Sequence, residues 1–212
     1  MILLHGNGED SGYFSAQIEA FSKDFHVYAV DTRGHGKTPR GDAPFTIRQF
    51  AQDLSCFMDE HGIEKAHILG FSDGANIAVC FALSYPERVR SLILNGGNLD
   101  PSGVKRIYQI PIEIGYRIAS RAAGKKEDAR RNAELLGLMV NDPALSPREL
   151  SAIHVPALVI AGTRDMIKNA HTRLIAESIP GATLAILPGD HFIAAKKPDS
   201  FNKTVMQFLH SL

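Results

Sequence analysis

Short apolar runs alternate with segments of helical periodicity along most of this 212-residue chain. The runs that have the length of a β-strand contain continuous apolar residues and lie at 2–4, 27–30, 68–70, 92–94, 158–161 and 184–187. Continuous apolar runs are typical of parallel strands that are covered on both faces. This feature constrains the fold strongly, because neighbouring parallel strands must be joined by long crossover connections.

Helical patterns fill the intervals between these runs. One begins at Thr46, which has capping-box spacing with Gln49, and others span residues 73–84, 169–178 and 198–212. The alternation of strands and helices predicts an α/β fold of three layers, with a mostly parallel sheet of about six strands and right-handed crossovers.

Composition excludes several classes of partner. The chain is 44% hydrophobic and carries 23 basic and 23 acidic residues, so it can bury a substantial core and has no net formal charge. Nothing in this balance favours nucleic acid or an anionic membrane as a partner. No apolar stretch approaches the roughly 20 residues of a membrane span, and no basic segment precedes an apolar signal core. We therefore expect a soluble, cytoplasmic protein.

Residues 99–147 interrupt the alternation, because they contain helical patterns but no convincing strand. We expect them to form a small helical lid, inserted into a core of residues 1–98 and 148–212. Between Lys105 and Arg131 the insertion has eight basic and three acidic residues. A solvated helix face is the favoured interpretation of this basic run, and steering of an anionic ligand is the alternative.

The two cysteines, Cys56 and Cys80, do not have the spacing of a redox or metal motif. A single pair in a chain of this size does not indicate a disulfide framework. We predict two reduced, buried thiols.

Chemically active residues follow the predicted strands. Ligand sites in open parallel sheets form beyond the carboxyl ends of the strands, so the residues after each apolar run are the candidates. Polar and glycine-rich segments stand there at 5–8, 31–36, 71–74, 162–165 and 188–192. They bring Ser72, Asp165 and His191, in that chain order, to one end of the sheet.

The segment Gly70-Phe71-Ser72-Asp73-Gly74 resembles the G-x-S-x-G nucleophile elbow of the α/β-hydrolase superfamily, in the strand-to-helix setting that the motif requires. The resemblance covers residues 1–212, and the Ser-Asp elbow is similar to that of biphenyl-hydrolase-like esterases with small lids. It implies a cofactor-independent serine hydrolase with an α/β-hydrolase fold.

The chemistry accounts for the residue types. A serine hydroxyl is a weak nucleophile at neutral pH and needs a base, which His191 would supply, while Asp165 would fix the imidazole tautomer. Flanking glycines would let Ser72 adopt a strained backbone. The N–H of Asp73, at the start of a helix, would stabilise an oxyanion. The resemblance implies that the N–H of Asn7 is the second donor.

Each assignment has an alternative. Ser72 could be only a helix N-cap, and Asp190 competes with Asp165 as the acid of the triad. His5 and His35 compete with His191, although His35 lies in a Gly-His-Gly turn that resembles a structural loop of the family. We expect Asp31 and Arg33 to hold that loop in place.

The sequence leaves the roles of three other side chains open. Phe71 and Phe192 flank catalytic positions and are candidates for the wall of a substrate pocket, but either could be ordinary core. The side chain of Asp73 could be solvated or could hold a residue of the lid or of a loop, and the sequence does not decide between these roles.

The resemblance also implies an association surface. Relatives usually have two further strands before the one that ends in His-Gly, whereas this chain begins at that strand. Residues 25–31 would then form a bare sheet edge, which is an association hazard. We expect either a truncated product or a second chain that covers the edge, and we predict a homodimer or poor solubility.

The sequence therefore predicts hydrolysis of a small ester, lactone or related carbonyl substrate through an acyl-enzyme on Ser72. Carbon–carbon bond hydrolysis or cofactor-free perhydrolysis by the same triad is an alternative, and so is a small-molecule receptor that does not turn over. No sequence pattern indicates a metal or a nucleotide cofactor.

Overall fold

The strands form one parallel sheet. A computed structural model describes residues 1–212, and in it the strand order is β2-β1-β3-β4-β5-β6, with every neighbouring pair parallel. The strands are β1 (Ile2–Leu4), β2 (Tyr28–Val30), β3 (Ala66–Phe71), β4 (Val89–Asn95), β5 (Ala157–Gly162) and β6 (Thr183–Leu187). All six predicted strands are confirmed. The chain winds outwards in both directions from β1, which creates a switch point between β1 and β3.

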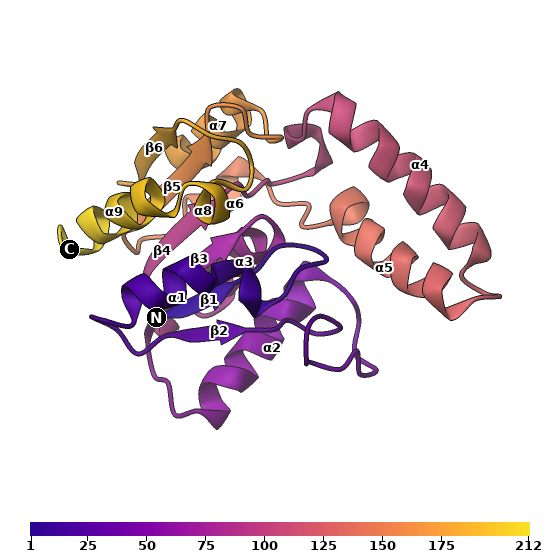
Figure 1. The fold of residues 1–212 in the computed structure, drawn as a ribbon, viewed down its shortest axis with the longest axis horizontal. Helices are drawn as coiled ribbons and strands as arrows, with labels where there is room; N and C mark the ends of the chain where they lie inside the picture. Colours follow the sequence, from indigo (N-terminus) through magenta and orange to yellow (C-terminus); the bar gives the residue numbers. More distant parts are fainter.

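Helices cover both faces of the sheet, which confirms the predicted three-layer α/β fold (Figure 1). On one face α2 (Ile47–Glu60), α3 (Asp73–Ser84), α6 (Pro147–Leu150) and α7 (Asn169–Ser178) enclose a cluster of 29 buried residues. On the other face α1 (Ser15–Phe21), α8 (Ile193–Lys196) and α9 (Pro198–Leu209) enclose a cluster of 15. The sequence did not predict α1 or α8, and α9 ends three residues before the predicted helix end.

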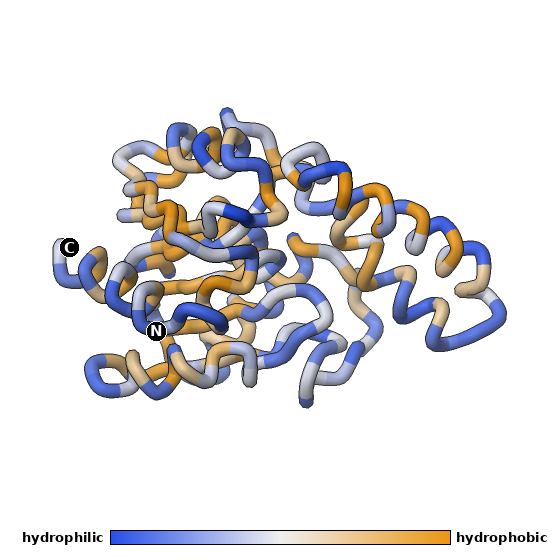
Figure 2. Tube along the Cα trace, turned by 45° about the horizontal axis from the view of Figure 1, so that its top comes forward, coloured by the Kyte–Doolittle hydropathy of each residue, from blue (hydrophilic) through white to orange (hydrophobic).

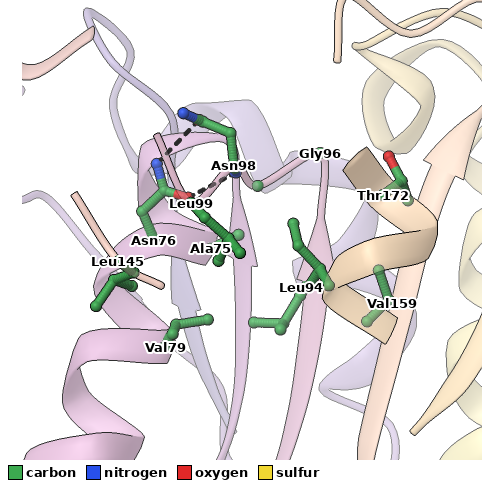
Figure 3. Close-up of a pocket in the computed structure, with 12 residues that line it drawn as sticks. Ala75, Asn76, Val79, Leu94, Gly96, Asn98, Leu99, Leu145, Val159 and Thr172 are labelled. Carbon is green, nitrogen blue, oxygen red and sulfur yellow. Dashed lines mark hydrogen bonds between the residues drawn. The ribbon is translucent and has the colours of Figure 1, made fainter. Parts of the chain in front are cut away.

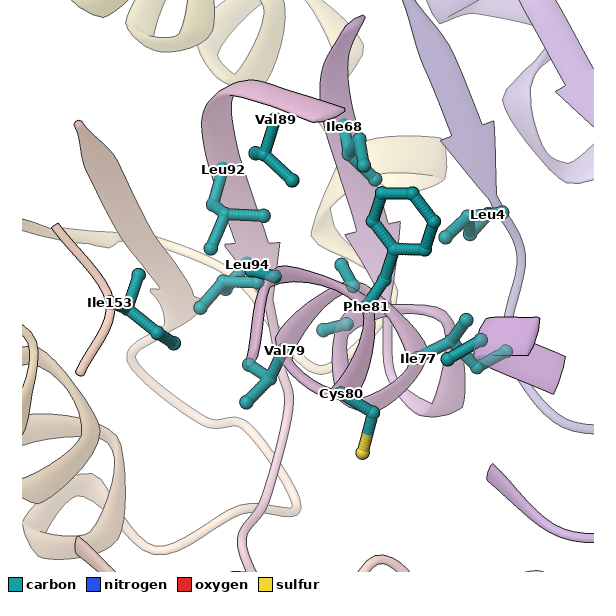
Figure 4. Packing of buried hydrophobic residues seen from close by; sticks show 14 of the residues in the cluster. Leu4, Ile68, Ile77, Val79, Cys80, Phe81, Val89, Leu92, Leu94 and Ile153 are labelled. Carbon is teal, nitrogen blue, oxygen red and sulfur yellow. The ribbon is translucent and has the colours of Figure 1, made fainter. Parts of the chain in front are cut away.

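Helix α3 is the centre of the larger core. Figure 4 shows Phe81 packed towards Ile68 of β3 and Leu4 of β1, with Val79 turned towards Leu94 of β4. Buried apolar residues cover most of this helix, because it lies between the sheet and its neighbours α2 and α6. This packing fixes the start of α3, and therefore the residues that precede it.

The cysteine prediction is wrong for one residue. Cys80 of α3 is buried, but Cys56 of α2 is exposed, and both thiols are free. Helix α2 is amphipathic, and its core positions include Phe50, Leu54 and Met58. Cys56 lies outside that apolar set, so its thiol faces away from the core.

A helical hairpin projects from the core within residues 99–147 (Figure 1). It consists of α4 (Arg106–Ala122) and α5 (Glu127–Asn141), which pack against each other. Figure 2 shows hydrophobic segments along α4, whose outer face exposes Ile107, Ile110, Ile114 and Ile118. Helix α5 contacts the core through its buried Leu138, which belongs to the larger cluster.

The predicted sheet edge is present, because β2 occupies one end of the strand order. The strand is only three residues long, and a short edge strand offers few unpaired backbone groups to a second chain. None of the helices is long and apolar enough to cross a membrane.

Candidate active site

The turn between β3 and α3 holds Ser72 in a strained conformation. Its φ of 53° and ψ of −118° lie in a region that side chains rarely occupy. The turn closes only because its flanking residues are glycines: a Cβ on Gly70 would lie 2.2 Å from the carbonyl oxygen of Gly74. A Cβ on Gly74 would lie 2.0 Å from the carbonyl oxygen of Leu4. The glycines of the elbow therefore have the steric role that the sequence predicted.

The hydroxyl of Ser72 is not a helix cap. Ser72 occupies the N-cap position of α3, yet its side chain makes no capping hydrogen bond. Its backbone N–H donates to the carbonyl of Asn95, at the end of β4, over 2.8 Å. The backbone is held while the half-buried hydroxyl stays free to react.

His191 and Asp165 form a buried pair. His191 Nδ1 lies 2.7 Å from Asp165 Oδ1, and the two residues are 6% and 0% exposed. The same oxygen accepts the N–H of Ile167 at 2.9 Å, whereas Asp165 Oδ2 is buried without a hydrogen-bond partner. An ionised Asp165 requires a proton on Nδ1, which leaves Nε2 of the imidazole free to act as a base.

Asp190, the alternative acid of the triad, makes other contacts. Asp190 Oδ1 accepts the N–H of Phe192 at 3.0 Å, and Oδ2 pairs with Lys196 Nζ at 2.6 Å. Both contacts are exposed, so Asp190 stabilises the turn before α8 rather than the imidazole of His191.

Gly96 connects the elements of this site and was missed by the sequence analysis. It follows β4, has a φ of +65°, and a Cβ on it would lie 2.9 Å from Cε1 of His191. The adjacent carbonyl of Asn95 accepts the Ser72 N–H. The end of β4 therefore contacts both the elbow and the imidazole. The Asn95-Gly96-Gly97-Asn98 segment after a predicted strand was the signal that could have identified it.

Two backbone N–H groups near Ser72 lack acceptors. The Asn7 N–H makes no hydrogen bond to the protein. Asp73 is the first residue of α3, so its N–H has no acceptor within the helix. Both loops follow neighbouring strands, β1 and β3, at the same end of the sheet.

The side chain of Asp73 is buried and hydrogen-bonded. It is 7% exposed, and its Oδ2 accepts a hydrogen bond from Asn7 Nδ2 at 3.0 Å. Burial raises the pKa of Asp73 to about 6, against the opposing effect of the Asn7 hydrogen bond. Asn7 Nδ2 also donates to the carbonyl of Leu135 in α5 at 2.7 Å, so Asp73 and the hairpin share this amide.

His5 and His35, the alternatives to His191, make structural hydrogen bonds. His5 Nε2 accepts the N–H of Thr32 at 3.1 Å, so Nδ1 carries the proton that it donates to the carbonyl of Gly6 at 2.7 Å. Burial lowers the pKa values of both His5 and His35. His35 is 4% exposed, and its Nδ1 lies 3.0 Å from the carbonyl of Arg33. Neither imidazole has a carboxylate partner.

The loop that carries His35 is held as predicted. Asp31 accepts the N–H groups of Ser11 and Lys37 at 2.7 and 2.8 Å. Arg33 makes a bidentate contact with Asp53 at 2.7 and 2.6 Å.

The two phenylalanines differ. Phe71 is buried, stacks on Tyr13 with ring centroids 4.4 Å apart, and lies 4.8 Å from the His191 ring. Phe192 is 41% exposed and lies 5.8 Å from Phe71. Phe71 therefore packs behind the imidazole, and only Phe192 presents an open face beside it.

Two cavities lie among the elements described above, and neither is lined by Ser72, Asp165 or His191. The one in Figure 3 lies between α3, β4 and α7 and holds only about 10 Å³, which is no more than one water occupies. The second, of about 540 Å³, lies between the loop after β1 and the hairpin, and its lining includes Glu9, His35, Arg131 and Leu135. Burial raises the pKa of Glu9 to about 7, and Glu9 Oε2 accepts the Gly6 N–H at 3.2 Å. No sequence pattern had indicated a role for Glu9.

Known proteins are similar to this chain in sequence and in fold. A family model described as alpha/beta hydrolase fold matches residues 1–110. The chain is 31% identical over 238 residues to a protein from Azorhizobium caulinodans that is named as the carbamate hydrolase RutD, with 98% of this chain and 90% of that protein covered. Its namesake from Caulobacter sp. strain K31 is 28% identical over 240 residues, with 99% and 90% covered.

A solved structure agrees over nearly the whole chain. The enol-lactonase from Burkholderia xenovorans LB400 is 27% identical, has a TM-score of 0.82, and matches 99% of this chain and 90% of its own. These relatives are named as enzymes, and the family model spans more than half of the chain. The chain is therefore an enzyme that belongs to the α/β-hydrolase family.

Proposed function

We propose that the chain is a cofactor-independent serine hydrolase that cleaves a small carboxylic ester or related carbonyl compound through Ser72, His191 and Asp165. Two observations carry the proposal: the buried 2.7 Å contact between His191 Nδ1 and Asp165, and the strained backbone of Ser72, whose hydroxyl makes no capping hydrogen bond. The end of β4 connects them, because Asn95 accepts the Ser72 N–H and Gly96 lies against the imidazole. A serine hydrolase of the triad type uses this combination of a base, its orienting carboxylate and a nucleophile.

The proposed reaction has two halves. His191 Nε2 takes the Ser72 proton as Oγ attacks the carbonyl carbon, and the N–H groups of Asn7 and Asp73 stabilise the oxyanion. The bond to the leaving group then breaks, and the leaving oxygen receives the proton from His191. Water repeats the sequence on the acyl-enzyme, which releases the acid and restores Ser72. Asp165 remains ionised throughout and stabilises the imidazolium.

The relatives support the substrate class. One relative is named as a lactonase and another as a carbamate hydrolase, and lactones and carbamates both carry an acyl carbon bonded to oxygen.

Steady-state hydrolysis of p-nitrophenyl acetate tests the proposal. Wild-type protein should turn over continuously, and the Ser72→Ala variant should lose this activity. The Ser178→Ala variant, which removes an exposed hydroxyl at the end of α7, is the matched control and should retain full activity. A single stoichiometric burst would instead indicate a receptor, and equal turnover by the Ser72→Ala variant would exclude Ser72 as the nucleophile.

A further inference from the structure

The side chain of Asn7 lies between the nucleophile elbow and the hairpin. Its Nδ2 donates one hydrogen bond to Asp73 Oδ2 at 3.0 Å and another to the carbonyl of Leu135 at 2.7 Å. These partners are 66 and 128 residues away in sequence, on α3 and on α5. Both N–H bonds of the amide are therefore committed, one to each side.

The loop around Asn7 needs such an anchor. Gly6 and Gly8 flank Asn7, and Gly8 has a φ of +74°, so the backbone has little intrinsic preference for one conformation. His5 Nδ1 holds the Gly6 carbonyl at 2.7 Å, but the contacts between Gly6 and Glu9 on either side of Asn7 are long. The Glu9 N–H reaches the Gly6 carbonyl at 3.3 Å, and the Gly6 N–H reaches Glu9 at 3.2 Å. The two side-chain bonds of Asn7 are shorter than the Gly6–Glu9 contacts. They fix the direction of the Asn7 Cα–Cβ bond, which also orients the adjacent peptide N–H.

The hairpin is held to the core beside the same point. Arg40 contacts Glu134 with Nε and Nη2, the closest approach being 2.7 Å, and Glu134 precedes Leu135 on α5. The Arg40 guanidinium also lies 5.0 Å from the centre of the Phe45 ring. This bidentate pair is partly buried and holds the turn of α5 that presents the Leu135 carbonyl to Asn7.

We propose that Asn7 is a positioning residue that couples the seating of the hairpin to the oxyanion site: the Leu135 carbonyl and the Asp73 carboxylate together set the orientation of the Asn7 backbone N–H. This inference rests on the proposed function, because it takes that N–H as an oxyanion donor. A displaced hairpin withdraws one acceptor from the Asn7 amide and leaves the donor misaligned. Turnover then depends on the hairpin even though α5 supplies no reacting group.

A double-mutant cycle tests the coupling. Asn7→Ala should lower kcat roughly tenfold or more with little change in KM, since a misplaced donor affects the transition state more than ground-state binding. Arg40→Met should lower kcat several-fold in the wild-type background but less than about twofold in the Asn7→Ala background. Equal fold-changes for Arg40→Met in the two backgrounds, including no change in either, would overturn the proposal.

A second readout does not depend on turnover. Hydrogen exchange of the α5 amides should be faster in Asn7→Ala than in the wild type, because the hairpin loses one of its hydrogen bonds to the core. Arg130→Met is the matched control, since it removes an exposed ion pair with Glu127 within α5 and leaves the link to the core intact. Unchanged α5 exchange in Asn7→Ala would overturn the coupling. If the wild type hydrolyses no ester but α5 exchange rises as expected, the proposed function fails while the link between Asn7 and the hairpin stands.

Discussion

Replacing Asp73 with asparagine should make the protein more stable as the pH rises, relative to the wild type. Burial raises the pKa of Asp73 from 3.8 to about 6, and the negative charge of Asp142 adds to this effect. Hydrogen bonds from Asn7 and Asn76, and the proximity of His191, act in the opposite direction without cancelling it. The folded protein therefore holds the proton on this carboxyl more tightly than the unfolded chain does.

The sign and size follow from linkage. A raised folded-state pKa favours folding below pH 3.8, and this contribution is lost as the pH rises through 6. At 1.36 kcal/mol per pKa unit, the cost of the ionised Asp73 grows from about 1 kcal/mol near pH 4.5 to about 3 kcal/mol at pH 7. The Asp73→Asn variant does not have this cost, and its amide oxygen can still accept the Asn7 hydrogen bond.

Urea unfolding of both proteins between pH 4.5 and 7.5 measures the difference. The free energy of unfolding of Asp73→Asn, minus that of the wild type, should increase by about 2 kcal/mol over this range. Ser72→Ala is a suitable control, because it alters the neighbouring residue without removing an ionisable group. A difference between Asp73→Asn and wild type that stays constant with pH would refute the assignment of a raised pKa to the buried carboxyl.

Three further outcomes are expected. Gly96→Ala should lower kcat at least tenfold in the ester assay and cost about 1–2 kcal/mol of stability, because the new Cβ meets the His191 ring and the backbone has a positive φ. Wild-type kinetics for this variant would contradict the steric role of Gly96. Glu9→Gln should lower kcat/KM above pH 7 but not below pH 6, because the Glu9 carboxylate attracts a charged His191 only when it is ionised. An equal loss of kcat/KM at every pH would exclude an electrostatic role of Glu9. Although β2 offers only three residues to a second chain, the open edge at residues 25–31 should give a homodimer or poor solubility in light scattering, and a well-behaved monomer at high concentration would count against this.

The sequence predicted the elements whose determinants are local. The elbow depends on residues 70–74, and the steric need for its glycines arises within the turn itself and from the adjacent strand β1. Continuous apolar runs located the strands, and capping residues located α2. The resemblance favoured Asp165 over Asp190 as the acid of the triad, and the structure shows that Asp190 pairs with Lys196 instead.

The remaining features depend on contacts between distant residues. Gly96 is required because the imidazole of His191, 95 residues later, packs over it. The role of the Asp73 side chain depends on where Asn7 and Leu135 lie, and no local pattern connects those residues. The exposure of Cys56 depends on which face of α2 meets the sheet. Such features become predictable only when the packing of the elements is known.

Covalent labelling of Ser72 gives the sharpest test of its role as the nucleophile. The wild-type protein would be treated with a fluorophosphonate probe and digested, and the modified peptide would be identified by mass spectrometry. The account predicts one adduct per chain, on the Ser72 hydroxyl, and much slower labelling in the His191→Ala variant, which lacks the base. An unlabelled Ser72, or labelling at the same rate without the imidazole, would contradict it.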